Sequence, residues 1–166
     1  MRWLVDGYNV IRRDPDLRAR EAESLEAGRR ALLGLVARRA GGSRDTFTVV
    51  FDGARVTGGA PGAGRVQVLF SRPPRTADDE LMRLAREGGA GTAVVSSDRR
   101  VQDAARRAGC AVLDAERFLD ALAGAPAGGG EDEDAEERPR DKRGNPRRPS
   151  KKARAAARAL RRLRSS

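Results

Sequence analysis

The 166-residue chain has no histidine and only one cysteine, Cys110, and its first lysine is Lys142. Without histidine, the chain cannot form a Ser-His-Asp triad, a histidine general base or a histidine metal ligand. One cysteine excludes both an intramolecular disulfide framework and a cysteine-based zinc site. The missing lysines exclude Schiff-base and Ser-Lys chemistry from residues 1–141. Carboxylates, hydroxyls, arginines, backbone amides and a bound metal ion therefore remain for catalysis.

The sequence also lacks the motifs of common nucleotide sites and of membrane insertion. It contains no Gly-Lys-Ser or Gly-Lys-Thr, which excludes a P-loop, and no G-x-G-x-x-G after a strand pattern, which argues against a dinucleotide site. No apolar run reaches the roughly 18 residues of a membrane span, and the start lacks the apolar stretch of a signal peptide. We therefore expect a cytoplasmic protein that has no membrane partner.

The net charge of +10 is concentrated towards the C-terminus. Residues 138–166 carry 13 basic side chains and one acidic side chain, whereas residues 131–137 carry six acidic side chains. A Gly- and Pro-rich stretch precedes that acidic block and is typical of a flexible linker. We expect a folded domain over 1–123, a Gly/Pro-rich and acidic linker over 124–137, and a basic tail over 138–166. The tail is expected to be disordered or partly helical and to bind a polyanion such as RNA, although a solvated extension explains its composition as well.

Short β-branched and apolar runs alternate with longer helical patterns along residues 1–123. The patterns predict strands at 3–5, 46–51, 65–70, 92–95 and 110–113, and helices at 20–39, 76–87, 100–108 and 115–122. Strands that are separated by helices are typical of βαβ units. The sequence therefore predicts an α/β fold, namely a three-layer, Rossmann-like α/β/α domain with a mostly parallel sheet.

Acidic residues follow the predicted strands at the point where each strand ends. Asp6 follows the first strand, Asp52 the second and Asp98 the fourth, while Asp78 and Asp79 come shortly after the third. In open parallel sheets, ligands bind at the carboxyl ends of the strands. Clustered carboxylates repel one another unless protons or a cation compensate them, and Mg²⁺ or Mn²⁺ prefers oxygen ligands. Such a metal site is suited to phosphodiester cleavage, because it activates water and neutralises charge on the phosphate.

The direction of the strand at 65–70 decides whether the third acidic pair belongs to this edge. The preceding segment, 52–64, has no helical pattern to carry a crossover, so a hairpin and an antiparallel strand are an alternative. We predict a parallel strand, because only then do Asp78 and Asp79 lie at the same edge as the other acids.

Four short motifs together resemble one known family. They are V-D-G-Y-N-V-I at 5–11, V-F-D-G at 50–53, T-A-D-D at 76–79 and S-S-D-R at 96–99. In order and spacing they resemble the YacP-like NYN-domain branch of the PIN-like nucleases, over about residues 1–122. The resemblance implies a PIN-like fold and a metal-dependent endoribonuclease that cleaves mRNA associated with the ribosome.

The resemblance also implies roles for individual residues. By matching position, Asp6, Asp78 and Asp98 form the acidic site that holds Mg²⁺ or Mn²⁺, and Asn9 and Ser97 support it. We expect Asp52 and Asp79 to assist. Structural explanations exist for several of these residues, because Thr76 and Asp79 have the spacing of a helix capping box, and Ser97 and Asp98 are both suited to cap the helix at 100–108. The stretch from Asp6 to Asn9 also has the composition of a simple turn.

RNA contacts are predicted for residues near this edge and in the basic tail. Tyr8 is suited to stack on a base, and arginines near the acids are suited to contact phosphates. Trp3 and Cys110 are expected to pack in the core instead. The full set of predicted RNA-binding residues is Tyr8, Arg55, Arg72, Arg75, Arg99, Arg147, Arg148, Lys151, Lys152, Arg154 and Arg158.

Two other functions are alternatives to cleavage of RNA. A non-catalytic RNA- or ribosome-binding protein on the same scaffold would explain the basic tail, but it has no use for clustered negative charge. Phosphotransfer at a strand-end aspartate is disfavoured, because the families that use it need a lysine in the site. In phosphatases of that type a second acid stands where this chain has Tyr8.

Overall fold

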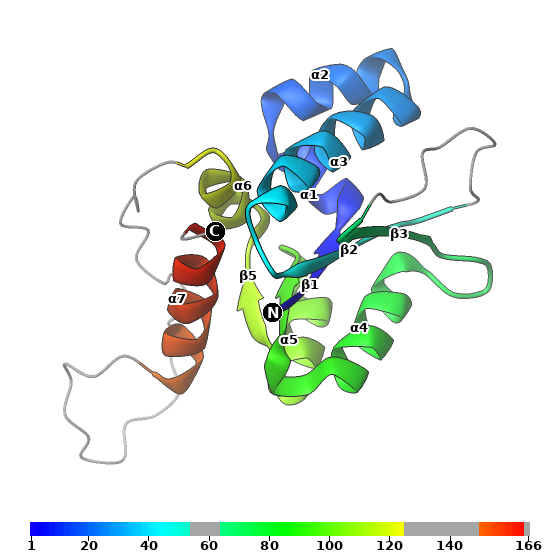
Figure 1. Cartoon of the computed structure of the whole chain (residues 1–166). Coiled ribbons are helices and arrows are strands. Elements are labelled where there is room, and N and C mark those ends of the chain that lie inside the picture. The colour runs from blue at the N-terminus through cyan, green and yellow to red at the C-terminus, as the bar shows by residue number, and fades with distance from the viewer. Residues whose placement is uncertain (54–63, 125–149, 165–166) are drawn as a thin grey trace, which may run out of the picture.

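Five parallel strands form a single sheet in the computed structural model, which describes residues 1–53, 64–124 and 150–164. Their order across the sheet is β3-β2-β1-β4-β5, so the chain starts in the centre and builds outwards in both directions. Figure 1 shows β1 between its neighbours. The bounds of the strands are β1 Arg2–Asp6, β2 Thr46–Phe51, β3 Val66–Phe70, β4 Thr92–Val95 and β5 Ala111–Leu113.

Strand β3 pairs with β2 in parallel, with Phe70 opposite Phe51. The predicted direction of this strand is therefore confirmed. As a result, the carboxyl ends of β2 and β3 lie at the same edge of the sheet as those of β1 and β4.

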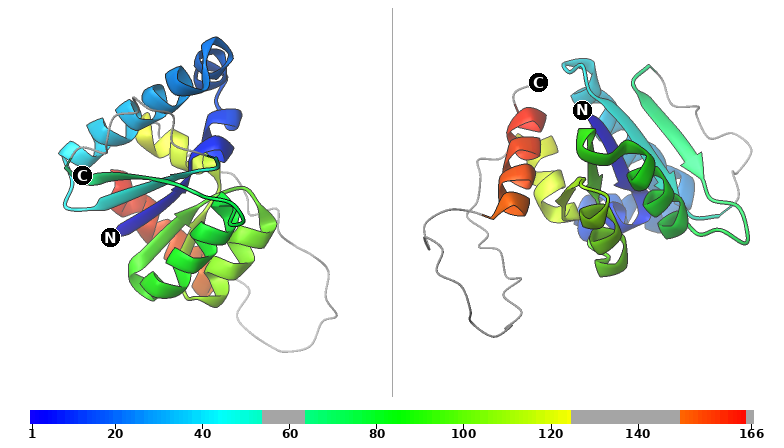
Figure 2. Two further views of the ribbon diagram at one scale, coloured as in Figure 1. Left: turned by 90° about the vertical axis from the view of Figure 1, so that its right-hand side faces the viewer. Right: turned by 90° about the horizontal axis from the view of Figure 1, so that it is seen from below.

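Helices cover both faces of the sheet, which confirms the predicted three layers (Figure 2). One hydrophobic core contains Trp3 and Val5 of β1 and lies under several helices. The other contains Leu4 of β1 and packs against two helices. The helices of the first face are α1 Gly7–Arg13, α2 Pro15–Glu23, α3 Leu25–Gly41, α6 Ala115–Leu122 and α7 Lys151–Arg164; those of the second are α4 Ala77–Gly88 and α5 Arg99–Arg107, and the short 3₁₀ turn η1 Gly89–Gly91 follows α4.

The helix predicted at 20–39 is wrong in its extent, because the chain forms two helices there. Ser24 ends α2 and caps α3, where its hydroxyl accepts a hydrogen bond from the Ala27 amide at 3.0 Å. Asp14 likewise caps α2 through the Leu17 amide at 2.8 Å. A serine or aspartate side chain that accepts from a free amide stabilises a new helix start, and this local bond outweighs a continuous helical pattern.

Helix α7 extends the packed core beyond the predicted domain end at residue 123. Ala159 and Leu163 are buried in the first core, together with Trp3. The Arg162 Nε also donates to Oδ1 of the buried Asp45 at 2.8 Å, and Asp45 Oδ2 accepts from Trp3 Nε1 at 3.0 Å. The charge pattern had pointed only to a basic tail, whereas a stripe of small apolar residues on α7 docks the helix onto the domain.

The core residues that the sequence suggested are placed as expected. Trp3 is fully buried and its ring is stacked on that of Phe47 at 6.0 Å between centroids. Cys110 is buried, and its thiol donates to the Ala85 carbonyl at 3.3 Å. Within residues 1–53, 64–124 and 150–164, no helix is both long and apolar enough to cross a bilayer.

Candidate active site

Asp6 ends the central strand and starts the helix that follows it. Its Oδ1 accepts a hydrogen bond from the Asn9 amide at 3.2 Å, which caps α1, so these residues are more than a turn. Its Oδ2 accepts from the hydroxyl of Ser96 at 2.9 Å. Gly7 is required here, because a Cβ at this position would lie 2.2 Å from Cε1 of Phe51. The aromatic ring of β2 thus packs directly on the backbone that holds Asp6.

Burial makes Asp6 a weaker acid than an exposed aspartate. The side chain is nearly inaccessible, and loss of hydration raises its pKa from 3.8 to about 6. The hydrogen bonds from Asn9 and Ser96 oppose this shift, while the charges of Asp78 and Asp98 add to it. These three acids, which lie far apart in the sequence, therefore interact electrostatically at one edge of the sheet.

Ser96 links two of the acids, although the sequence did not single it out. It follows β4 directly and is fully buried. Its hydroxyl donates to Asp6 and accepts from the Asp98 amide at 3.1 Å, and its carbonyl accepts from Gln102 Nε2 at 2.8 Å. Asp98 in turn caps α5 through the Val101 amide at 3.1 Å, which confirms its predicted role as a cap.

Asp78 and Asp79 lie in the first turn of α4 but differ in their surroundings. The capping box predicted for Thr76 and Asp79 is present, and its hydrogen bonds lower the pKa of Asp79. Asp78 accepts no hydrogen bond from any described residue. Burial raises its pKa, and the charge of Asp98 raises it further, with smaller effects of Asp79 and Asp52 in the same direction and of Arg100 in the other. Asp78 is thus the less compensated acid of the pair.

Asp52 stands where β2 ends and joins the neighbouring strand through a side chain. The hydroxyl of the buried Ser71, which follows β3, donates to Asp52 Oδ1 at 2.5 Å. The Gly53 amide donates to the same hydroxyl oxygen at 3.3 Å. Asp52 is exposed to solvent, and its charge acts on Asp78.

The predicted supports, Asn9 and Ser97, contact each other. Asn9 Oδ1 accepts from the Ser97 amide at 2.9 Å. The Ser97 hydroxyl donates to Glu116 Oε2 at 3.3 Å and accepts from the Ala115 amide at the same distance. Glu116 also pairs with Arg13 at 3.2 Å. Sequence reasoning missed Glu116, which brings a further acid from α6 next to Ser97.

The donor set suits a hard divalent cation that keeps part of its water shell. All its candidate ligands are oxygens; the charges of Asp78 and Asp98 raise the pKa of Asp6, and that of Asp98 raises the pKa of Asp78. Within the described part of the chain, no three acidic or cysteine side chains form a ready-made metal cluster. Mg²⁺ is commonly held by one or two carboxylates and several waters, so mutually repelling acids without a closed cage fit this cation.

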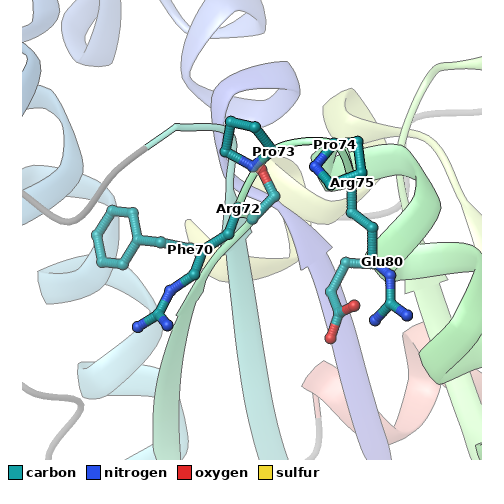
Figure 3. A pocket seen from close by; sticks show the side chains of 7 residues that line it. Phe70, Arg72, Pro73, Pro74, Arg75 and Glu80 are labelled. Atoms are coloured by element: carbon teal, nitrogen blue, oxygen red, sulfur yellow. The ribbon is translucent and has the colours of Figure 1, made fainter.

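A pocket of about 490 Å³ borders the Asp52 side of this edge, since Ser71 lines it. Figure 3 shows Phe70 and Arg72 on one side of the pocket and Arg75 and Glu80 on the other. Arg72 and Arg75, both predicted to contact RNA, are exposed. The charge of Arg75 acts on Asp79 and Glu80, so positive charge that is suited to contact a phosphate backbone lies beside this pair of acids.

The other residues predicted to bind RNA are spread over the molecule. Arg99 is exposed in the first turn of α5, next to Asp98. Tyr8 is half-buried, and its ring meets Phe51 edge to face at 5.2 Å. Four basic residues of α7 are exposed: Lys151, Lys152, Arg154 and Arg158. Arg55, Arg147 and Arg148 lie outside the described residues.

Comparison with known proteins gives the family. A family model described as YacP-like NYN domain matches residues 3–164. Uncharacterized protein YacP of Bacillus subtilis (strain 168) is 36% identical over 84 residues, which make up 49% of this chain and 49% of that protein, so the chain matches about half the length of this curated relative.

Solved structures agree with this match. A crystal structure of Rae1 (YacP) from Bacillus subtilis is similar at 29% identity and a TM-score of 0.65, and that of a mutant of the same protein at 28% and 0.60. Each comparison covers 74% of both chains. The predicted PIN-like α/β fold is thereby confirmed. The chain belongs to the YacP-like NYN domain family, a family of nuclease-like domains.

Proposed function

We propose that this protein is a metal-dependent endoribonuclease whose carboxylates hold Mg²⁺ or Mn²⁺. The observation that carries the proposal is the mutual repulsion of Asp6, Asp78 and Asp98, which come from three separate parts of the chain. Such repulsion costs stability and is compensated when a divalent cation binds. Membership in a nuclease-like family favours cleavage of nucleic acid over other uses of a cation site.

Each residue of the site has a distinct part in this proposal. Asp6, Asp78 and Asp98 would hold the ion, and Ser96 fixes the orientation of Asp6. Asn9 and Ser97 brace the loop after β4, while Ser71 orients Asp52 beside the arginine-lined pocket. A bound ion of this type supplies an activated water and neutralises charge on the phosphate.

RNA as the substrate is supported by the distribution of positive charge. Arg72 and Arg75 flank the acidic edge, and α7 exposes a second basic surface. Arginine contacts of this kind hold the phosphate backbone without reading its sequence. A location in the cytoplasm is part of the proposal, and so is mRNA on the ribosome as the target, which follows from the family resemblance alone.

The experiment compares cleavage by wild type with that by Asp78→Asn and Asp98→Asn, with Mn²⁺ or Mg²⁺ and a labelled RNA. Asp78→Asn removes a charge without breaking a hydrogen bond to any described residue. Asn caps helices as well as Asp, so Asp98→Asn is expected to remain folded. Asp103→Asn, an exposed acid on α5, is the matched control. Both site variants should lose at least about a hundredfold in rate and still bind RNA.

A non-catalytic RNA- or ribosome-binding protein remains the second candidate, because the basic surfaces explain binding without cleavage. Wild type that binds RNA but cuts none with any divalent ion would favour it. Site variants that cut as fast as wild type would refute the assignment of the site. Adding purified ribosomes to the same assay tests whether cleavage depends on this partner.

A further inference from the structure

A buried arginine packs against the last residues of β2 and β3, close to the acidic edge. It belongs neither to the predicted site residues nor to the family motifs. Arg29 of α3 is 8% exposed. Its Nε donates to the hydroxyl of Tyr8 at 2.8 Å, and its Nη2 donates to the same oxygen. Its guanidinium carbon lies 5.6 Å from the ring centre of Phe51 and 5.2 Å from that of Phe70.

Arg29 has no carboxylate partner among the described residues. A buried charge without a counterion is costly, and most buried arginines are therefore paired with an acid. Aromatic rings compensate part of this cost through cation–π attraction, but they carry no net charge. The site thus has a positive charge that an anion can neutralise.

The hydroxyl of Tyr8 can still donate one hydrogen bond. A phenol oxygen accepts through its lone pairs and donates one hydrogen. Arg29 supplies two N–H groups to the lone pairs, and the hydroxyl donates to no described residue. A hydroxyl that accepts from a guanidinium is also more polarised as a donor. The arrangement therefore prepares Tyr8 to donate to a negatively charged acceptor.

Tyr8 and its neighbours lie at the edge where substrate is expected. Tyr8 stands two residues after Asp6, and its ring contacts Phe51, the residue before Asp52. Phe70, which stacks on Phe51 at 5.8 Å, lines the pocket that also contains Arg72 and Arg75 (Figure 3). The ring of Tyr8 is thus linked through Phe51 and Phe70 to the pocket that Arg72 and Arg75 line.

We propose that Arg29 is a positioning residue that holds Tyr8 so that its hydroxyl donates to a backbone phosphate oxygen of bound RNA. The inference rests on the proposed function, which supplies the RNA. It replaces base stacking as the role of Tyr8, because Phe51 contacts the ring, and the guanidinium carbons of Arg12 and Arg29 lie 5.8 and 5.4 Å from its centre.

The experiment measures binding and cleavage of a labelled single-stranded oligoribonucleotide by Tyr8→Phe, Arg29→Met and the double variant. Tyr8→Phe keeps the ring and its packing, so it tests the hydroxyl alone. Arg30→Met removes a neighbouring charge whose side chain is 76% exposed, and it is the matched control. Binding is measured in EDTA and cleavage with Mn²⁺, and thermal melting verifies that each variant is folded.

Tyr8→Phe and Arg29→Met should each weaken RNA binding by about tenfold, as expected for one lost hydrogen bond to a charged group. KM should rise by a similar factor while kcat changes little, whereas a merely structural defect lowers the active fraction and hence kcat. The double variant should bind no more weakly than either single one, because both remove the same contact. The variants should lose the same affinity for an oligoribonucleotide with a 5′-hydroxyl as for one with a 5′-phosphate, because the proposed acceptor is a backbone phosphate.

Several results would overturn the inference. One is that Tyr8→Phe binds RNA as tightly as wild type does. Another is that the fold loss of affinity in the double variant equals the product of the two single losses. A third is that affinity is lost only for the oligoribonucleotide with the 5′-phosphate. If Arg29→Met does not fold, Tyr8→Phe decides alone. Wild type that binds and cuts RNA alongside an unaffected Tyr8→Phe leaves the proposed function standing and removes only this inference. Wild type that neither binds nor cuts RNA removes both.

Discussion

The buried carboxylate of Asp6 should make the metal-free protein less stable as the pH rises. Its pKa is about 6 in the folded chain against 3.8 ordinarily, so the folded state binds more protons than the unfolded state between these values. The contribution of protonated Asp6 to the free energy of unfolding is therefore fully present below about pH 3.8, and it is lost as the pH rises through about 6. A shift of this size corresponds to about 3 kcal/mol.

The perturbation that isolates this effect is Asp6→Asn, which removes the titrating group. Asn retains an oxygen for the Asn9 amide, so α1 stays capped. The assay is urea unfolding in EDTA at a series of pH values from about pH 4 to about pH 8. The variant should gain stability relative to wild type by about 2 to 3 kcal/mol over this range, whatever the constant offset between them.

The exposed Asp103→Asn provides the background that loss of any surface acid contributes. A difference between Asp6→Asn and wild type that stays constant with pH would refute the reasoning. So would a difference of the opposite sign, since it would mean that hydrogen bonds from Ser96 and Asn9 outweigh the loss of hydration at Asp6.

Three further predictions address the ion, the backbone of the site and the last helix. Mn²⁺ at about a hundred times its dissociation constant should stabilise wild type at neutral pH by about 2.7 kcal/mol in thermal melting, and Asp78→Asn much less; equal gains would argue against the site. Gly7→Ala should lower the free energy of unfolding by about 1–3 kcal/mol, because the new Cβ would lie 2.2 Å from Phe51. Gly34→Ala, whose Cβ would have its nearest contact at 3.8 Å, should be tolerated, and equal unfolding midpoints of the two variants would contradict this prediction. Leu163→Ala should cost about 2–5 kcal/mol in urea unfolding and the half-buried Leu160→Ala less, while no loss at Leu163 would mean that α7 does not stabilise the domain.

The acids of the site could be predicted from the sequence because their positions follow from one rule. Asp6, Asp52 and Asp98 stand just after β-branched or apolar runs and Asp78 lies in the first turn of the helix after the third run, and parallel strands bring their carboxyl ends to one edge. The direction of β3 could be inferred from the same rule, although the segment before it gave no helical pattern. Capping likewise depends on local spacing, so the roles of Asp79 and Asp98 were within reach.

The residues that sequence reasoning missed depend on contacts over long distances in the chain. Ser96 and Ser97 are adjacent and alike, and only the packing of β4 decides that Ser96 turns towards Asp6, 90 residues earlier. Arg29 belongs to a helix with many arginines, and nothing local separates it from the exposed Arg30. In α7 the stripe that docks is made of Ala155, Ala159 and Leu163, and small residues among arginines give a weak apolar signal.

The most direct test of the central claim is a crystal structure of the protein with Mn²⁺, in which anomalous scattering locates the ion. We expect an ion at the carboxyl edge of the sheet, with carboxylate oxygens of Asp6, Asp78 or Asp98 at about 2.1 Å and water in its remaining positions. Asp78→Asn should lose this peak. An ion bound elsewhere, or an empty edge at millimolar Mn²⁺, would mean that these acids do not form a metal site.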